Sequence, residues 1–208
     1  RNSIKILINA YDGTIKYYIT DRTDPIAMAY YRIYPDIFQD IDTEIPEDIS
    51  KHFVYPEYLY NIQSEILSTF HNVKPDVLYR SDDIWDYATY NSTLNTKSTG
   101  SKLAPYYTIV KTKDNQEGAI GLIQMYTPED KQNIISYLVG AYENGTPKLK
   151  MYKFTTDTSV LGSMQLDKQI EQDETIWTEL NALNVTGTKV TKNMIIVPIE
   201  NTLLYIEP

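Results

Sequence analysis

Apolar residues alternate with other residues on both sides of an Asp-Gly pair near the start of the chain. The alternation covers residues 4–8 and 15–19, and Asp12-Gly13 lies between the two stretches. This pattern is typical of a β-hairpin closed by a type I′ turn, so it predicts two antiparallel strands. Asp before Gly at a hairpin tip is explained by its tolerance of positive φ, which favours a structural role for Asp12 over a catalytic one.

Prolines mark the expected helix starts after this hairpin. Asp24-Pro25 combines a capping side chain with a residue suited to the first helical position, which predicts a helix through about Tyr34. A second helix is expected after Pro46. Pro56 precedes the strongest helical pattern in the chain, whose apolar residues share one face and predict a core element: Leu59, Ile62, Ile66, Leu67 and Phe70.

The middle of the chain holds a short helical signal and a polar segment. Ser81, with Asp82 and Asp83 behind it, predicts the start of a short helix that carries Trp85. Residues 91–104 are rich in Ser, Thr, Asn and Lys, which predicts a loop or a subdomain boundary inside the single region 1–208.

The composition of the second half favours strands. We expect them at 106–112, 119–127, 134–142, 148–155, 189–199 and 203–206, with a turn at Asn144-Gly145. Helices are expected to start at Thr127-Pro128 and to cover 176–183. Several connections are short and no regular βαβ alternation occurs. The sequence therefore predicts an α+β fold with a mixed, largely antiparallel sheet and several packed helices.

Acidic residues outnumber basic ones, with 28 Asp and Glu against 19 Lys and Arg, for a formal charge of −9. This balance disfavours nucleic acid and anionic lipid as partners, because both attract proteins with a surplus of Lys and Arg. Cysteine is absent, which excludes thiol catalysis, Cys-ligated zinc and iron–sulfur clusters. No stretch approaches the roughly 18 consecutive apolar residues of a membrane-spanning helix, so we expect residues 1–208 to be soluble.

The sequence contains no recognisable catalytic, cofactor-binding or metal-binding motif. The two histidines, His52 and His71, lack a metal-binding spacing, and each lies beside an expected helix end, where it can bond to terminal carbonyls. GxSxG, GxxxxGK[ST] and GxGxxG are absent. The carboxylates form two loose groups that we interpret as solvated faces: Asp40, Asp42 and Glu44, and Asp82, Asp83 and Asp86. We therefore assign no catalytic residue, no metal site and no cofactor, and leave binding residues unassigned.

Tyrosine is unusually frequent, with 19 residues against 4 Phe. Tyr combines an apolar ring with a polar tip, which suits half-buried positions, interfaces and sugar-stacking platforms. The clusters that could line such a surface are Tyr30-Tyr31, Tyr55/Tyr58/Tyr60 and Tyr106-Tyr107. The alternative is that Tyr simply replaces Phe in strands and at core edges, and the sequence leaves both interpretations open.

Four ordered stretches resemble one known family. They cover residues 1–26, 55–71, 104–110 and 197–208, and they contain Tyr11-Asp12-Gly13, Asp24-Pro25, Tyr55-Pro56, Gln63, His71, Pro105-Tyr106-Tyr107 and Pro198-Ile199-Glu200. Together they resemble UPF0182, a family of large uncharacterised bacterial membrane proteins. Two segments depart from the resemblance: 91–104 matches no shared block, and the Gly that usually precedes the final strand pair is missing near Thr188–Met194.

The resemblance implies a location and a context more than an activity. It implies that the chain is part of the long soluble region of a multi-pass protein at the cell membrane, on the extracytoplasmic side. We also expect an excised piece because the chain begins at Arg1 without Met and stops at Pro208 after a strand-like run. The implied partners are its own transmembrane region or cell-envelope components, with membrane contact only through the rest of the full-length chain. No catalytic residues can be transferred from the family.

Three functions are compatible with these observations. The leading hypothesis is a non-catalytic extracytoplasmic binding or interaction domain. The alternative is a cell-envelope polymer-processing enzyme that uses two carboxylates, about 5 to 10 Å apart, in a Tyr-lined cleft. A third is a structural lobe that completes the full-length assembly, which predicts an exposed apolar patch larger than roughly a few hundred Å².

Overall fold

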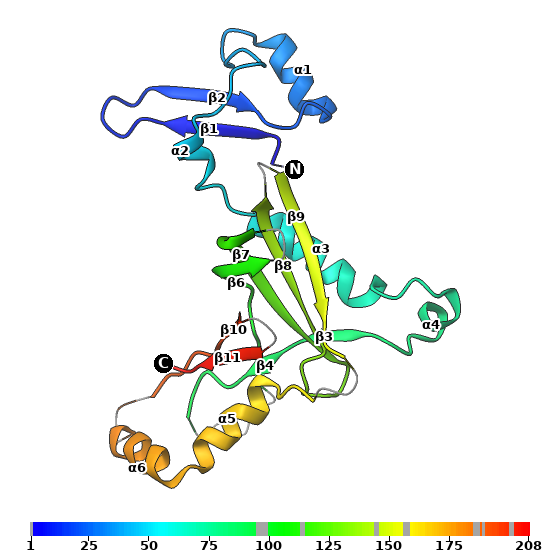
Figure 1. Ribbon diagram of the computed structural model, residues 1–208, viewed down its shortest axis with the longest axis vertical. Helices are drawn as coiled ribbons and strands as arrows, with labels where there is room; N and C mark the ends of the chain where they lie inside the picture. Colours follow the sequence, from blue (N-terminus) through cyan, green and yellow to red (C-terminus); the bar gives the residue numbers. More distant parts are fainter. Residues whose placement is uncertain are drawn as a thin grey trace.

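The chain folds into an elongated molecule with a sheet in its middle and smaller units at both ends (Figure 1). This computed structural model describes residues 2–94, 100–112, 115–143, 146–155, 159–184, 188, 190–199 and 202–208. Within these ranges the chain forms six helices and eleven strands. Neighbouring strands in every sheet pair antiparallel, which confirms the predicted α+β class.

The N-terminal unit is a hairpin with one helix beside it, followed by a single helical turn. The hairpin is β1 (Ile4–Ile8) and β2 (Ile15–Ile19), and the helices are α1 (Pro25–Ile33) and α2 (Glu47–Ser50). Asp24 caps α1 as predicted, because its carboxylate accepts the backbone N–H groups of Ile26 at 2.9 Å and Ala27 at 3.3 Å.

The predicted hairpin is confirmed, but its turn is longer than a type I′ turn. Ile8 pairs with Ile15, so residues 9–14 form the connection. Gly13 has a φ of 73°, whereas Asp12 does not adopt positive φ. Asp12 instead accepts the backbone N–H of Thr14 at 2.9 Å, and this bond lowers the pKa of its exposed carboxyl. Asp12 therefore stabilises the turn through its side chain and not through its backbone conformation.

The central sheet is organised around β7, which pairs with strands along both of its edges. β8 and then β9 lie on one side, while β6 and β3 pair with successive parts of the other side. Helix α3 packs next to β3 and β7, and α4 extends away from the sheet (Figure 1). The bounds are β3 (Trp85–Tyr87), β6 (Tyr106–Thr112), β7 (Asn115–Pro128), β8 (Ser136–Glu143), β9 (Thr146–Lys153), α3 (Glu57–Phe70) and α4 (Pro75–Arg80).

β7 contributes side chains to two separate cores. Ile123 and Met125 belong to a core that also contains Ile196 of the C-terminal unit. Leu122 and Tyr126 belong to a second core beneath α3. The side chains alternate in this way because successive residues of a strand point to opposite faces of the sheet. Both faces of the sheet are therefore covered in its middle, and β7 lies between the two cores.

The C-terminal unit combines two short helices with two strand pairs. It consists of β4 (Thr89–Tyr90), β5 (Ser101–Lys102), α5 (Ser163–Gln172), α6 (Glu174–Leu183), β10 (Ile195–Ile199) and β11 (Thr202–Ile206). Ser163 joins α5 to β4 by donating its hydroxyl to the carbonyl of Thr89 at 2.7 Å. The predicted helix at 176–183 is confirmed by α6, whereas α5 was missed. Asp173 caps α6 through the backbone N–H groups of the first turn.

Two predicted helix starts are wrong. Ser81 ends α4 instead of starting a helix, and its φ of 56° is left-handed; Trp85 then begins β3. Thr127-Pro128 closes β7, where it pairs with the first two residues of β3. Strand pairing thus outweighs a capping pattern in both segments. The expected turn at Asn144-Gly145 lies outside the described residues.

The polar segment 91–104 has buried residues near both ends. Leu94 and Leu103 are both buried, and β5 lies within the segment. Residues 95–99 lie outside the described ranges. A subdomain boundary at 91–104 stays a prediction.

Candidate interaction surface

Helix α3 arranges its side chains in four rows, each made of positions four residues apart. Two rows face the sheet, and two face solvent. The rows on the sheet side are Leu59, Gln63 and Leu67, and Tyr60, Ser64 and Ser68. The rows on the solvent side are Glu57, Asn61, Glu65 and Thr69, and Tyr58, Ile62, Ile66 and Phe70. One solvent-facing row is therefore polar and the other entirely apolar.

The apolar solvent-facing row contradicts the core that the sequence predicted for this helix. We call Tyr58, Ile62, Ile66 and Phe70 the α3 ridge, and their exposed fractions are 81, 43, 54 and 60%. Ile62, Ile66 and Phe70 were expected in the core. The row that contains Tyr60 packs against the sheet instead. Tyr60 is fully buried, and its hydroxyl donates to a β8 carbonyl at 2.9 Å.

Small residues let α3 approach the sheet on that side. The hydroxyls of Ser64 and Tyr126 lie 2.6 Å apart, and the Tyr126 hydroxyl also lies 3.0 Å from the carbonyl of Ser64. Gly140 of β8 completes the fit, since a Cβ there would lie 2.6 Å from the Tyr60 ring. The polar and small row is therefore buried, and the apolar ridge is left outside.

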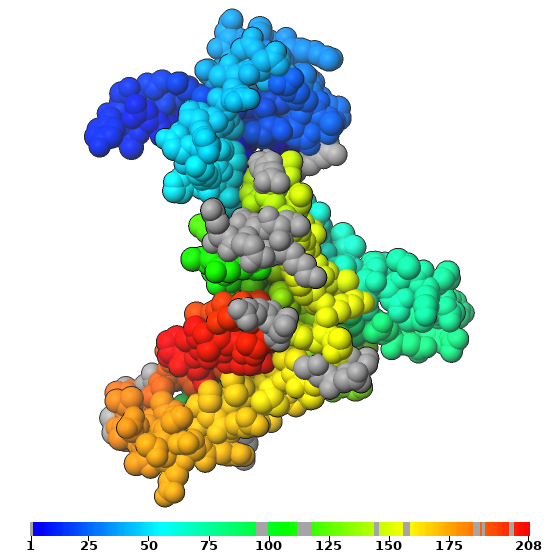
Figure 2. Space-filling model, viewed as in Figure 1, coloured from blue at the N-terminus to red at the C-terminus, as the bar shows by residue number. Residues whose placement is uncertain are grey.

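Two further apolar faces are exposed in the N-terminal unit. One is on α1 and consists of Ile26, Tyr30 and Ile33; the other is on the hairpin and consists of Ile6, Ile8 and Ile15. The hairpin residues share a face because Ile8 lies opposite Ile15 and Ile6 is two positions away along the strand. In Figure 2 the hairpin projects from the body as an arm.

Several of the predicted tyrosine clusters serve packing. Tyr106 donates its hydroxyl to a β10 carbonyl at 2.6 Å, and Tyr107 donates to the carbonyl of Tyr55 at 2.9 Å. Tyr55 itself is buried and bonds to the side-chain oxygen of Gln63. These contacts favour the interpretation that Tyr replaces Phe at core edges while its hydroxyl satisfies backbone carbonyls.

The remaining members of the clusters lie nearer the surface. Tyr31 packs edge-on against Phe38 at 5.9 Å between ring centroids. Tyr30 and Tyr58 are exposed, and Tyr30 stacks on Tyr34. Tyr107 is also exposed, so the exposed members of the clusters lie on α1, α3 and β6. The hydrogen bond from Tyr107 to Tyr55 joins two of the three predicted clusters.

His71 contacts both the end of α3 and the first residue of β3, and so links the two elements. Its Nδ1 is 3.2 Å from the carbonyl oxygen of Ser68, and its Nε2 is 3.1 Å from Oδ2 of Asp83. The ring stacks on Trp85 with 3.5 Å between centroids. Burial raises the pKa of Asp83, but hydrogen bonds from Asn72, His71 and Trp85 outweigh it, so the pKa is lowered. The contact with the Ser68 carbonyl is the helix-end role predicted for His71.

The other predicted polar residues do not gather around His71. His52 is exposed after α2. Asp42 pairs with Arg22 at 2.9 Å and Asp86 with Lys102 at 3.5 Å, both at the surface. Across the described part of the chain, no three His, Asp or Glu side chains are arranged to hold a metal ion.

A buried charge cluster, which the sequence did not indicate, joins α5 to the end of the chain. Lys192 approaches Asp167, Glu171 at 2.8 Å and Glu207 at 3.6 Å, and its side chain is only 5% exposed. Burial lowers the pKa of Lys192, but its hydrogen bonds to Asp167 and Glu171 raise it above the ordinary value. Burial raises the pKa of Glu207 to about 7. The members of this charge cluster are far apart in the sequence, so no local motif predicts the cluster.

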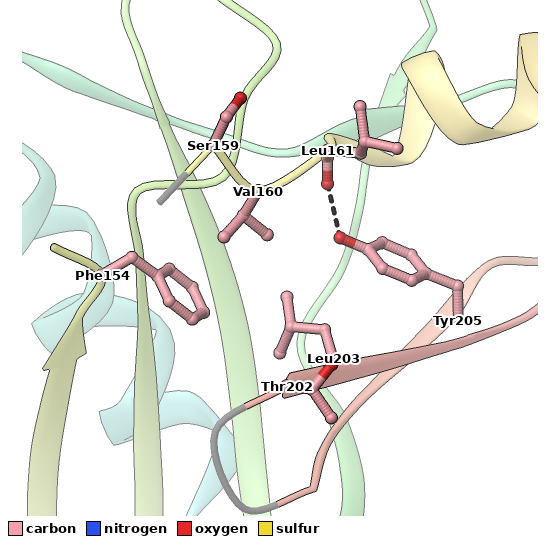
Figure 3. Close-up of a pocket in the computed structure, with 7 residues that line it drawn as sticks. All are labelled: Phe154, Ser159, Val160, Leu161, Thr202, Leu203 and Tyr205. Atoms are coloured by element: carbon pink, nitrogen blue, oxygen red, sulfur yellow. Dashed lines mark hydrogen bonds between the residues drawn. The ribbon is translucent and has the colours of Figure 1, made fainter. Parts of the chain in front are cut away.

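Two pockets lie away from His71 and Lys192. Figure 3 shows one of about 230 Å³, lined by Phe154, Ser159, Val160, Leu161, Thr202, Leu203 and Tyr205. In this pocket the hydroxyl of Tyr205 donates to the carbonyl of Leu161 at 2.5 Å. The other, of about 520 Å³, contains one carboxylate, Asp24, which accepts the hydroxyl of Ser3 at 2.6 Å. Neither pocket contains paired carboxylates.

Comparison with known proteins finds relatives that are all described as UPF0182 proteins. A UPF0182 protein of Caldicellulosiruptor saccharolyticus is 37% identical over 210 residues, which is all of this chain and 23% of that protein. Relatives from Desulforamulus reducens and Microcystis aeruginosa are 36% and 35% identical, again over all of this chain but only 22% and 21% of their own length. No solved structure matches.

The chain spans between a fifth and a quarter of the length of these relatives. No helix in the described residues is long and apolar enough to cross a membrane. The profile described as "Uncharacterised protein family (UPF0182)" matches residues 1–183. This match, together with relatives that align over the whole chain, shows that the chain belongs to the UPF0182 family.

Proposed function

We propose that residues 1–208 form a non-catalytic interaction lobe of a longer polypeptide, on the extracytoplasmic side of a membrane. The observation that carries the proposal is the amount of open surface. A compact monomer of 24.1 kDa exposes about 10,000 Å², whereas this chain exposes 13,836 Å². Much of the exposed apolar part lies on regular faces of α1, α3 and the N-terminal hairpin, which is the arrangement expected of surfaces that pack against something else.

The extracytoplasmic location is part of the same proposal. It derives from the resemblance of the chain to a family of membrane proteins. The alternative of a polymer-processing enzyme requires two carboxylates in one cleft, and neither of the two pockets described above contains two.

The test is to produce residues 1–208 and the remainder of the full-length polypeptide separately and to measure whether they co-purify. We expect a complex, since the exposed apolar faces would be covered in it. A variant in which Ile6, Ile26 and Ile62 of the exposed apolar faces are replaced by Ser, and in which the polar Glu57 row is unchanged, should bind more weakly. Separate elution of the two wild-type parts, combined with hydrolysis of envelope polymers by residues 1–208, would favour the enzyme instead.

The location has its own measurement. Residues 1–208 contain no cysteine, so in a full-length polypeptide with no other accessible cysteine a single Lys168→Cys variant on the exposed side of α5 reports the compartment through a maleimide that does not cross membranes. Labelling of intact cells is expected. Labelling only after lysis would place the lobe on the cytoplasmic side and contradict this part of the proposal.

A further inference from the structure

We propose that the α3 ridge is the docking site for one helix from the part of the polypeptide outside residues 1–208. This inference rests on the proposed interaction lobe. It assigns the contact to α3 and the partner to a helix of the same polypeptide. The four ridge residues are 43–81% exposed, although every one of them is apolar or aromatic. Val73, three residues beyond the end of α3, is also 85% exposed.

The spacing of the ridge indicates the shape of its partner. Residues at i, i+4, i+8 and i+12 form a continuous ridge along a helix, about 18 Å long at the rise of an α-helix. Such ridges fit into the grooves between the side chains of a second helix. The ridge lies on one regular element, Glu57–Phe70, and its row is inclined to the helix axis as such ridges are. A helix is therefore the occupant that this surface fits best.

The charges beside the ridge favour a basic partner over a second copy of the chain. The neighbouring solvent-facing row contains Glu57 and Glu65, and α3 has no Lys or Arg. In an antiparallel two-fold pair of α3 helices, this acidic flank would face itself. Each copy also carries a net charge of −9, which adds repulsion. A partner helix with an apolar stripe and Lys or Arg beside it satisfies both features.

The longer polypeptide provides enough chain for such a helix. In the relatives more than three quarters of the sequence lies outside the matched region, since the match covers 21–23% of each. A helix from the same polypeptide is also held at a high effective concentration, which makes a contact of this modest size stable. These two points favour the rest of the chain over a separate protein.

The first measurement is thiol protection. Ile62→Cys and Ile66→Cys are introduced singly into residues 1–208 and into the full-length polypeptide with no other accessible cysteine. We expect maleimide labelling of both to slow about tenfold or more in the full-length protein, because the site must open before it reacts. Lys168→Cys, exposed on α5, is the control and should react equally in both. Equal labelling of the two ridge cysteines in both proteins would overturn the proposal.

The second measurement identifies the occupant. A photo-reactive benzoylphenylalanine at position 66 of the full-length protein is cross-linked and the attached peptide is read by mass spectrometry. A peptide of the same molecule from outside residues 1–208 supports the proposal. A peptide from a second copy, a different protein or a lipid adduct contradicts it. If residues 1–208 still co-purify with the remainder while the ridge stays reactive, the interaction lobe stands and only the assignment of α3 fails.

Discussion

At the scale of single residues, Lys192 supports the C-terminal unit because it neutralises buried carboxylates. We expect Lys192→Met to lower the free energy of unfolding by about 3–5 kcal/mol, since Asp167 and Glu171 would keep their charge without a partner. Urea denaturation at neutral pH measures this. Lys168→Met, on the exposed side of α5, the helix that carries Asp167 and Glu171, should change stability by less than about 0.5 kcal/mol. Equal losses in both variants would show that the buried contacts do not matter.

Glu207 makes the stability of the same unit depend on pH. Burial raises its pKa to about 7, compared with about 4.3 for an unperturbed Glu. Between these values the folded chain binds the proton and the unfolded chain does not, so the free energy of unfolding falls as the pH rises. The loss is about 4 kcal/mol at most. Urea titrations of Glu207→Gln should lack this slope, while Glu179→Gln on exposed α6 should keep it; identical slopes would contradict the assignment.

Single residues also show which side-chain roles the sequence could predict. Asp24 was assigned correctly because a helix cap is a local contact between neighbours in the chain. The Lys192 cluster was missed because its members meet only after α5, β10 and β11 have packed together. His71 was assigned to a helix end, but its stacking on Trp85 depends on β3, which the sequence predicted as helix.

At the scale of elements, α3 separates residues that hold the fold from residues that are free for a partner. We expect Tyr60→Ala to cost about 3–5 kcal/mol, because the ring is fully buried and fits against Gly140. Ile66→Ala in the ridge should cost less than about 0.5 kcal/mol, since Ala also has a high helix propensity. Thermal and urea unfolding of residues 1–208 compare the two. A large loss from Ile66→Ala would place the ridge in the core.

The same helix explains why the apolar pattern predicted the correct element but the wrong buried face. The apolar period located α3 within one residue of its observed start, and Pro56 marked that start. The period cannot show whether an apolar row is covered by this chain or by another. The strands were predicted well where alternation is local, as in β1, β2 and β6, and less well where pairing overrides a capping signal, as at Thr127-Pro128.

At the scale of the whole molecule, the separated units should be visible in solution. A compact chain of 208 residues has a radius of gyration of about 17 Å. The elongated arrangement in Figure 2 predicts a clearly larger value for a monomer. Small-angle X-ray scattering measures it, with light scattering as the check that the sample is monomeric. A monomer at or below about 17 Å would contradict the extended shape.

The position of β7 between two cores has a consequence for how the molecule opens. Its residues Gly121, Leu122 and Ile123 pair with β6 on one edge and β8 on the other, so neither core can be lost without exposing this strand. Hydrogen exchange should therefore be slowest at these amides, and both cores should lose protection over the same range of denaturant. Release of one core while the other keeps its protection would be the contrary result. Unfolding of the two cores is thus coupled through a single strand.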